Sequence, residues 1–124
     1  MPVIPAPPAP THRLADTEFT SLATPSRGSR ETSVWRVDIA PYTQATPHQL
    51  TREEVFVVLA GAAKVRIGGE TAEARAGDAI VVPPDVDFEL ANDDAETLSL
   101  MCCLPVGGQG RIGDQAPFTP PWAQ

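Results

Sequence analysis

Basic residues are scarce in this chain of 124 residues, where nine Lys and Arg are outnumbered by sixteen Asp and Glu. The net charge is −7 and the isoelectric point is near 4.6. A protein that binds nucleic acid needs clustered basic side chains to neutralise phosphates and release counterions. Anionic membrane surfaces attract basic segments for the same electrostatic reason. We therefore expect neither nucleic acid nor a membrane among the partners.

Long apolar runs and an N-terminal targeting signal are also missing. A segment that crosses a bilayer needs roughly 18 consecutive apolar residues, and no run in this chain approaches that length. Residues 1–10 are half proline and lack both the basic stretch and the long apolar core of a signal peptide. The sequence therefore predicts a cytoplasmic protein.

Cysteine is rare as well. The only two, Cys102 and Cys103, are neighbours in an apolar run. A disulfide between adjacent residues is strained and rare. We therefore expect both thiols to be reduced, as in a reducing compartment.

The pattern that is present consists of short β-like runs separated by turn residues. Residues 33–39 alternate between apolar and polar side chains, which is typical of a half-buried strand. Further strands are expected at residues 54–59, 64–67, 70–75, 79–82, 87–91 and 97–104. About eight short strands without an amphipathic helix of normal length favour an all-β sandwich or barrel. A chain of this length can bury one core but not two, so one domain is expected.

Composition divides the chain into three parts. Residues 1–29 are a Pro-rich arm and lead-in, residues 30–106 carry the predicted strands, and residues 107–124 are a Gly/Pro-rich tail without periodicity. Proline prevents the first ten residues from forming a helix or a complete ladder strand. The arm is either disordered or extended along its own barrel or that of a partner, since Val3 and Ile4 offer apolar surface to bury.

Two motifs narrow the fold class. The first consists of His48, Leu50, Glu54 and Gly61, and the second of Gly77, Pro83, Phe88 and Asn92. Together they resemble the two motifs of the cupin family, with Leu50 and Phe88 standing where the family has histidines. The resemblance covers about residues 30–105. It implies a jelly-roll β-barrel of antiparallel strands formed by residues 30–106.

The resemblance also implies a site inside the barrel. Cupins with complete motifs hold a divalent metal ion through three histidines and one glutamate, and only His48 and Glu54 remain of that set here. A third ligand would have to be recruited, and Cys102 or Cys103 is well placed because one of two strand neighbours faces inward. We expect no cofactor, with a divalent transition metal at His48, Glu54 and one cysteine as the alternative.

Without a metal, His48 and Glu54 would be an imidazole and a carboxyl group in an otherwise apolar cavity. Burial would raise the pKa of Glu54, so that this group acts as an acid or base near neutrality. A hydrogen bond between the two would fix one imidazole tautomer. His48 and Glu54 are the predicted catalytic residues. The side chains predicted to contact a ligand are Leu50, Phe56, Val58, Phe88 and Arg36.

Several functions are compatible with this pattern. The first is binding of a small, mainly apolar metabolite, with metal-free acid–base chemistry of the isomerase, cyclase or lyase type. The second is an atypical metal-dependent dioxygenase or isomerase. The third is a non-catalytic ligand-binding or structural protein, in which His48 and Glu54 are a satisfied polar pair and apolar side chains fill the barrel. Arg36 either belongs to a solvated strand face or guides an anionic ligand.

A homodimer is expected. The resemblance implies association through a sheet face and exchanged terminal strands. Val55, Val57 and Leu59 would form an apolar outer face on one strand, because side chains two residues apart point the same way. The Pro-rich arm would suit an exchange between subunits.

Overall fold

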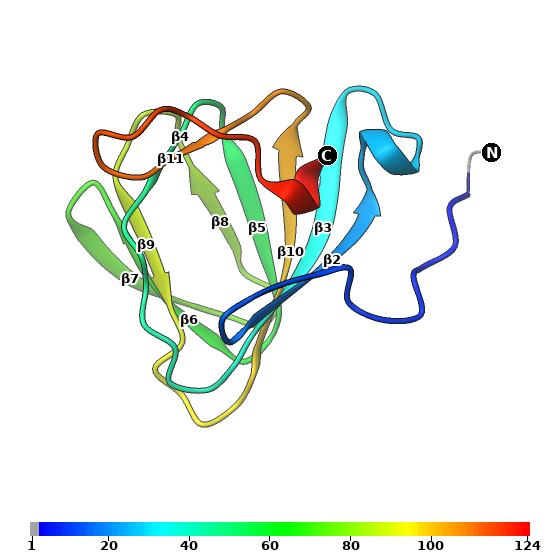
Figure 1. Cartoon of the computed structure of the whole chain (residues 1–124). Coiled ribbons are helices and arrows are strands. Elements are labelled where there is room, and N and C mark those ends of the chain that lie inside the picture. Colours follow the sequence, from blue (N-terminus) through cyan, green and yellow to red (C-terminus); the bar gives the residue numbers. More distant parts are fainter. Residues whose placement is uncertain (1–2) are drawn as a thin grey trace.

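The computed structural model describes residues 3–124, and within them it contains eleven strands, two short 3₁₀ helices and no α-helix (Figure 1). None of these described helices is long and apolar enough to cross a bilayer. All strand pairs are antiparallel. The structure confirms the predicted all-β jelly-roll fold.

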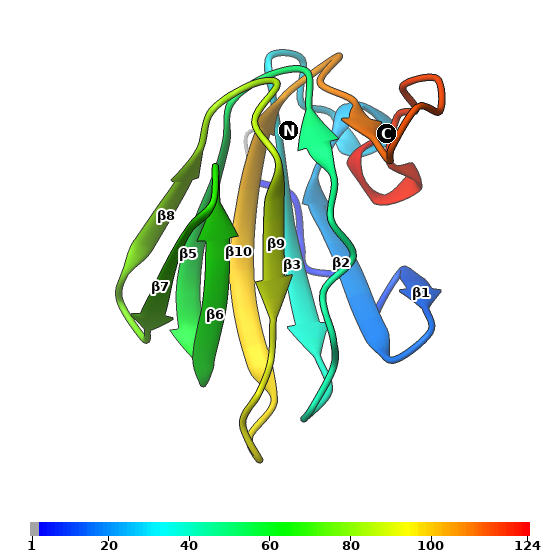
Figure 2. The ribbon, with the colours of Figure 1, turned by 90° about the vertical axis from the view of Figure 1, so that its left-hand side faces the viewer.

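Two sheets form the barrel and a third, smaller one lies at its end. The six-stranded sheet has the order β1 (His12–Leu14), β2 (Thr17–Ala23), β3 (Thr32–Ile39), β10 (Leu98–Pro105), β5 (Glu54–Ala60) and β8 (Ala79–Val82). The three-stranded sheet has the order β7 (Glu70–Arg75), β6 (Ala62–Ile67) and β9 (Phe88–Ala91). The smallest sheet pairs β4 (Gln49–Leu50) with β11 (Gly110–Arg111). The three-stranded sheet lies across from the six-stranded one (Figure 2).

Strand β10 lies at the centre of the larger sheet, between β3 and β5. Its inward-facing side chains, Leu98, Leu100, Cys102 and Leu104, are all buried. The matching inward positions of β3 carry Trp35, Val37 and Ile39, which are also buried. Burial of apolar area stabilises a fold by about 25 cal/mol per Å². The inward face of β3 and β10 is therefore a main source of the stability of the barrel.

The motif residues have the structural roles that their types suggest. Gly61 ends the turn after β5 with a φ of +83°, and a Cβ at this position would lie 2.7 Å from the carbonyl oxygen of Thr97. Only glycine fits there without displacement of backbone. Asn92, at the end of the second motif, is fully buried. Its Nδ2 donates to the carbonyl oxygens of Ile39, Ala40 and Glu96 at 3.1, 3.1 and 2.8 Å.

The sheets extend beyond the predicted strand-rich region at both ends. Strands β1 and β2 come from residues assigned to the arm and lead-in, and β11 comes from the predicted tail. Strand β2 pairs with its sequence neighbours β1 and β3, whereas β11 pairs with the distant β4. The second half of the tail also has structure, since it ends in the 3₁₀ helix η2 (Pro121–Ala123).

The Pro-rich arm is extended along its own chain. Arg27, in the 3₁₀ helix η1 (Pro25–Arg27), donates from Nη2 to the carbonyl oxygen of Pro5 at 2.6 Å. The backbone N–H of Thr11 donates to the carbonyl oxygen of Phe19 at 2.8 Å. One hydrogen bond thus joins residues 3–10 to η1, and none of these residues is buried. Met1 and Pro2 lie outside the described residues.

We expect Asn92→Ala to lower the free energy of unfolding by about 3 kcal/mol, because three buried carbonyl oxygens lose a donor. Urea denaturation followed by circular dichroism measures the change. Asp93→Ala is the control, because Asp93 is exposed and pairs only with Lys64, at 3.4 Å; its effect should stay within about 0.5 kcal/mol. Equal stability of the two variants would contradict the role given to Asn92.

Candidate functional site

A cavity of about 360 Å³ lies inside the barrel, within the size range of small-molecule sites. Its wall is mainly apolar and is built from both sheets and the C-terminal tail. The titratable side chains that line it are His48, Glu54 and Cys102, and within residues 3–124 no arginine or lysine does so. The structural alternative required a barrel filled by its own side chains, and this barrel is not filled.

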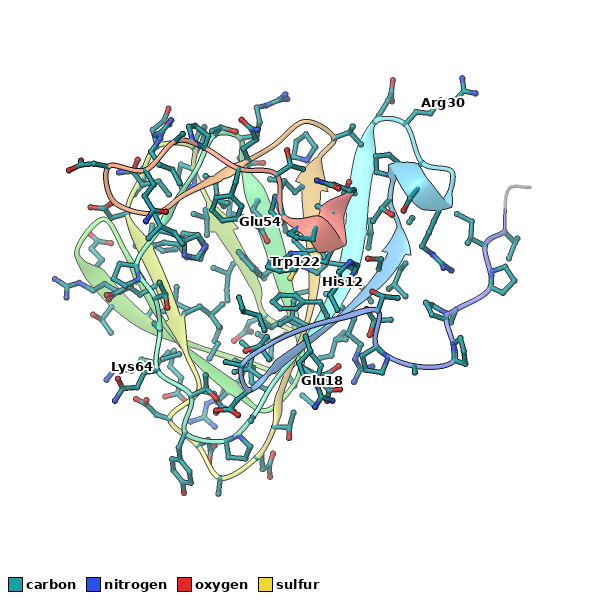
Figure 3. The ribbon with its side chains drawn as sticks, in the orientation of Figure 1. His12, Glu18, Arg30, Glu54, Lys64 and Trp122 are labelled. Atoms are coloured by element: carbon teal, nitrogen blue, oxygen red, sulfur yellow. The ribbon has the colours of Figure 1, made fainter. Side chains whose placement is uncertain are left out.

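Glu54 is the first residue of β5 and points into this cavity (Figure 3). Burial alternates along the strand, so Glu54 shares the inward face with Phe56 and Val58. The residue is only 5% exposed. No other group in the described part of the chain forms a hydrogen bond with its carboxyl. Burial raises the pKa of Glu54 from its ordinary value of 4.5 to about 8, so the carboxyl is protonated at neutral pH.

His48 lies just before β4, opposite β9. Its backbone N–H donates to the carbonyl oxygen of Phe88 at 3.1 Å, and the Phe88 N–H donates back at 2.9 Å. The imidazole packs against the Phe88 ring, with centroids 4.1 Å apart. Its Nδ1 is 2.9 Å from the carbonyl oxygen of Thr46, which can only accept. Nδ1 therefore carries the proton of the neutral ring, and Nε2 offers a lone pair.

The predicted hydrogen bond between His48 and Glu54 is absent from the described structure, which corrects that expectation. Each side chain reaches the cavity from a different element, and the nitrogen of His48 that has a partner contacts Thr46 instead. Burial lowers the pKa of His48, although the bond to Thr46 opposes that effect. At neutral pH the site therefore presents an uncharged acid and an uncharged acceptor.

The predicted ligand contacts divide into three groups. Leu50, Phe56 and Phe88 line the cavity. Val58 is buried but packs in the core away from the cavity wall. Arg36 lies on the opposite face of its sheet, where Nη2 is 3.1 Å from Asp38 Oδ1 and 3.3 Å from Ser99 Oγ. Strand alternation excludes it from the interior, so Arg36 belongs to the solvated face.

The donor set does not fit the metal site that the motifs imply. Within residues 3–124, no three His, Cys, Asp or Glu side chains are close enough to share a metal ion. Cys102 faces the cavity, whereas Cys103 lies on the outer side of β10. Burial, with a smaller contribution from Glu54, raises the pKa of the Cys102 thiol well above its ordinary value. Cys102 is therefore a neutral thiol near Glu54, and neither cysteine completes a site with His48.

Aromatic residues are concentrated at this cavity to a degree that the sequence pattern did not show. All four phenylalanines and both tryptophans line it, whereas the single tyrosine, Tyr42, is 70% exposed elsewhere. Phe19 of β2 stacks on Trp122 of η2 with centroids 3.7 Å apart and planes 6° apart. Phe56 and Phe88 bring rings from the two sheets within 5.8 Å of each other. The low aromatic content of the chain, 6%, is the only sequence feature related to this clustering.

Three serine hydroxyls hold the C-terminal tail against the barrel. Ser21 Oγ donates to the carbonyl oxygen of Trp122 at 2.7 Å, and Ser33 Oγ donates to that of Ala123 at 2.8 Å. Ser26 Oγ donates to the backbone oxygen of Gln124 at 2.7 Å. We call these three contacts the serine clamp. It places the Trp122 ring at the cavity wall (Figure 3).

A larger groove of about 620 Å³ lies on the outside of the same wall. Three of its polar side chains are engaged with one another: Gln49 Nε2 is 2.8 Å from Asp87 Oδ1, and Arg111 Nη1 is 3.3 Å from Gln49 Oε1. His48 is the residue that lines both the groove and the cavity. The interior is the better candidate site despite its smaller volume, because it contains the unpartnered carboxyl group.

Titration of Glu54 should change stability with pH. Its folded-state pKa is raised, so its protonated form stabilises the fold below about pH 4.5, and this contribution is lost as the pH rises through about 8. Relative to Glu54→Gln, the wild type should lose roughly 1.4 kcal/mol per pH unit within that window. Urea denaturation at several pH values measures the slope. The control is Glu53→Gln at the exposed neighbouring position, which should keep the wild-type slope. Parallel curves for wild type and Glu54→Gln would contradict the buried acid.

Comparison with known proteins places this fold. The family model for the cupin domain matches residues 35–104. The polyketide cyclase RemF from Streptomyces resistomycificus superposes with a TM-score of 0.72 at 19% identity, over 82% of this chain and 73% of that one. KdgF from Halomonas sp. gives 0.67 at 20% identity, over 78% and 86%. An RmlC-like cupin from Shewanella frigidimarina gives 0.64 at 19% identity, over 73% and 76%.

These identities are low enough that the solved structures show a shared fold and nothing finer. No curated protein sequence matches the chain. The family model covers more than half of the residues and spans both motifs around His48, Glu54 and Asn92. On this evidence the chain belongs to the cupin family.

Proposed function

We propose that the protein binds a small, uncharged, mainly apolar molecule in the barrel and transfers protons on it without a metal ion. Glu54 is the acid and His48 is the base. The observation that carries this proposal is the protonated Glu54 carboxyl, which lines the cavity and forms no hydrogen bond with any described residue. The protonated carboxyl is therefore free to donate a hydrogen bond to a ligand oxygen in the cavity.

The protonation states favour chemistry on a carbonyl compound. The Glu54 hydroxyl would donate to the carbonyl oxygen and draw electron density toward it. Nε2 of His48 would then accept a proton from the adjacent carbon, while Glu54 transfers its own proton to the oxygen and an enol forms. If the enol is conjugated with a second double bond, His48 returns its proton to a more distant carbon and the enol hydroxyl gives its proton back to Glu54, which completes an isomerisation. Attack of the enol carbon on a second carbonyl of the same molecule forms a ring, while His48 protonates the new hydroxyl and the enol proton returns to Glu54. Departure of a β-substituent with the His48 proton, while the enol proton returns to Glu54, gives an elimination.

Similar structures are compatible with this class of reaction. RemF is a polyketide cyclase, and a further cupin-fold match of 16% identity and TM-score 0.69 comes from a structure of DMSP lyases. Each shows that this fold accommodates enzymes acting on small molecules. The proposal for this chain depends on the cavity and on Glu54, and the neighbours only make it compatible with the fold.

Exchange of carbon-bound hydrogen tests the catalytic part directly. The ketone 2-tetralone carries acidic hydrogens next to its carbonyl, and nuclear magnetic resonance in heavy water follows their replacement by deuterium. We expect the wild type to accelerate exchange, and Glu54→Gln and His48→Ala each to reduce the acceleration by about 100-fold or more. Binding of the ketone should change by less than about threefold in Glu54→Gln, because the amide still donates a hydrogen bond.

The control variant for this experiment is Glu53→Gln, which should exchange hydrogen at the wild-type rate. A wild type that binds 2-tetralone without accelerating exchange would identify a non-catalytic binding protein. Undiminished exchange in Glu54→Gln would remove Glu54 from the mechanism.

We also propose that two copies of the chain associate through the outer face of the six-stranded sheet. Val55 and Val57 of β5 are half-buried on this face, and Leu59 is exposed there. Val81 of the neighbouring β8 is 51% exposed. Met101 and Cys103 of β10 continue the same apolar surface. An apolar patch across three adjacent strands is typical of an interface between subunits.

The location of the protein is proposed to be the cytoplasm. Cys102 and Cys103 are free thiols, with Cys102 buried in the core and Cys103 on the outer face of β10. Their opposite orientation on one strand separates the sulfur atoms. This arrangement supports a reducing compartment, where free thiols persist.

A charge in the centre of the outer face of the six-stranded sheet should separate the two copies of the proposed dimer. Val57→Arg is expected to sediment as a monomer at micromolar concentration, whereas the wild type sediments as a dimer, because a buried unpaired guanidinium is strongly unfavourable. Analytical ultracentrifugation measures the difference. Thr71→Arg, on the exposed surface of β7, is the control and should stay dimeric. A monomeric wild type would refute the interface.

A further inference from the structure

We infer that the ligand of this cavity is a flat aromatic molecule and that Phe118 and Trp122 of the C-terminal tail form the wall that selects it. This inference rests on the proposed function and names the class of molecule that the site accepts.

Aromatic side chains make up only 6% of the chain, yet every phenylalanine and tryptophan lines one cavity. They come from β2, β3, β5, β9 and the C-terminal tail, so they are far apart in sequence and meet only in the fold. The six are Phe19, Trp35, Phe56, Phe88, Phe118 and Trp122. The core away from the cavity is built from aliphatic residues such as Val58, Val65 and Leu98.

The rings approach the cavity from more than one side. Phe19 and Trp122 form a parallel stack beside β2. Phe88 of β9 contacts both His48 and Phe56 with tilted rings, at interplanar angles of 52° and 54°. Ring faces and ring edges are therefore both present in the same cavity. Aromatic ligands gain from such contacts beyond the burial of their area, whereas saturated ligands do not.

The tail side of this wall is held in position before a ligand arrives. The serine clamp fixes the backbone of residues 122–124, and the backbone groups of Gly110 and Phe118 exchange two hydrogen bonds of 2.9 Å. Phe118 is 39% exposed, so it stands where the cavity meets solvent. Preorganised side chains bind with a smaller loss of conformational freedom. Phe118 and Trp122 are therefore positioned as selectivity residues.

The cavity also specifies the charge of the aromatic ligand. Its three titratable side chains, His48, Glu54 and Cys102, are all neutral at pH 7, and none of its other lining residues in the described chain is charged. An ionised ligand would leave water without gaining a counter-charge. The combination of rings with a protonated carboxyl fits an uncharged aromatic ketone or phenol.

A matched pair of ketones tests the inference. The ligand 2-tetralone has one aromatic ring, and 2-decalone has the same carbon skeleton fully saturated. We expect the wild type to bind 2-tetralone about tenfold more tightly than 2-decalone, as measured by isothermal titration calorimetry. Phe118→Leu should reduce this ratio to about threefold or less by weakening 2-tetralone binding alone. Trp122→Leu, measured in parallel, should act in the same direction.

The control is Tyr42→Leu, which removes an aromatic ring outside the cavity and should leave the ratio unchanged. Circular dichroism confirms that each variant is folded. Equal affinity of the wild type for both ketones would overturn the aromatic inference and leave the proposed function standing. An unchanged ratio in folded Phe118→Leu and Trp122→Leu would overturn the role of the tail. Failure of the wild type to bind either ketone would overturn both proposals.

Discussion

The alternation of side chains along β5 is the constraint on which the site depends. Phe56 and Val58 must face the interior to build the core, and the residue two positions before Phe56 is then carried to the same face. That residue is Glu54. Strand β5 is paired on both sides, with β10 and β8. The position of the carboxyl group is therefore set by the packing of its neighbours and not by a partner of its own.

The packed apolar surroundings then determine the chemistry of this group. A carboxyl that loses water and gains no donor keeps its proton, and His48 loses charge for the same reason. The two side chains are separately anchored, one by the ladder of β5 and the other by paired backbone bonds to Phe88. The cavity is therefore uncharged at neutral pH, with one acid and one acceptor.

The sequence predicted most of the barrel because local patterns define most of its strands. Residues 70–75 and 79–82 were placed correctly, since turn residues bound them on both sides. The first strands and the tail were missed as barrel elements. Residues 12–23 lack clean alternation, and the position of Trp122 depends on Phe19 and Ser21 near the other end of the chain. Contacts of that range are not encoded in local periodicity.

Part of the candidate site was predictable from the sequence, but its geometry was not. The motif spacing indicated which residues face inward, and the structure brings His48, Leu50, Glu54, Phe56 and Phe88 to one cavity. Spacing along a strand says nothing about distance across the barrel. The expected hydrogen bond between His48 and Glu54 is therefore absent, because Nδ1 of His48 donates to the nearby carbonyl oxygen of Thr46 instead. Arg36 shows the reverse case, since alternation along β3 alone places it outside.

The electrical neutrality of the cavity has a kinetic consequence. The molecule as a whole carries a charge of −7, so its field repels anions and its strength varies with the salt concentration. A neutral molecule experiences no net force in that field, and its encounter with the barrel is governed by diffusion and by the opening near Phe118. Uptake should therefore proceed at the same rate in dilute buffer and in concentrated salt.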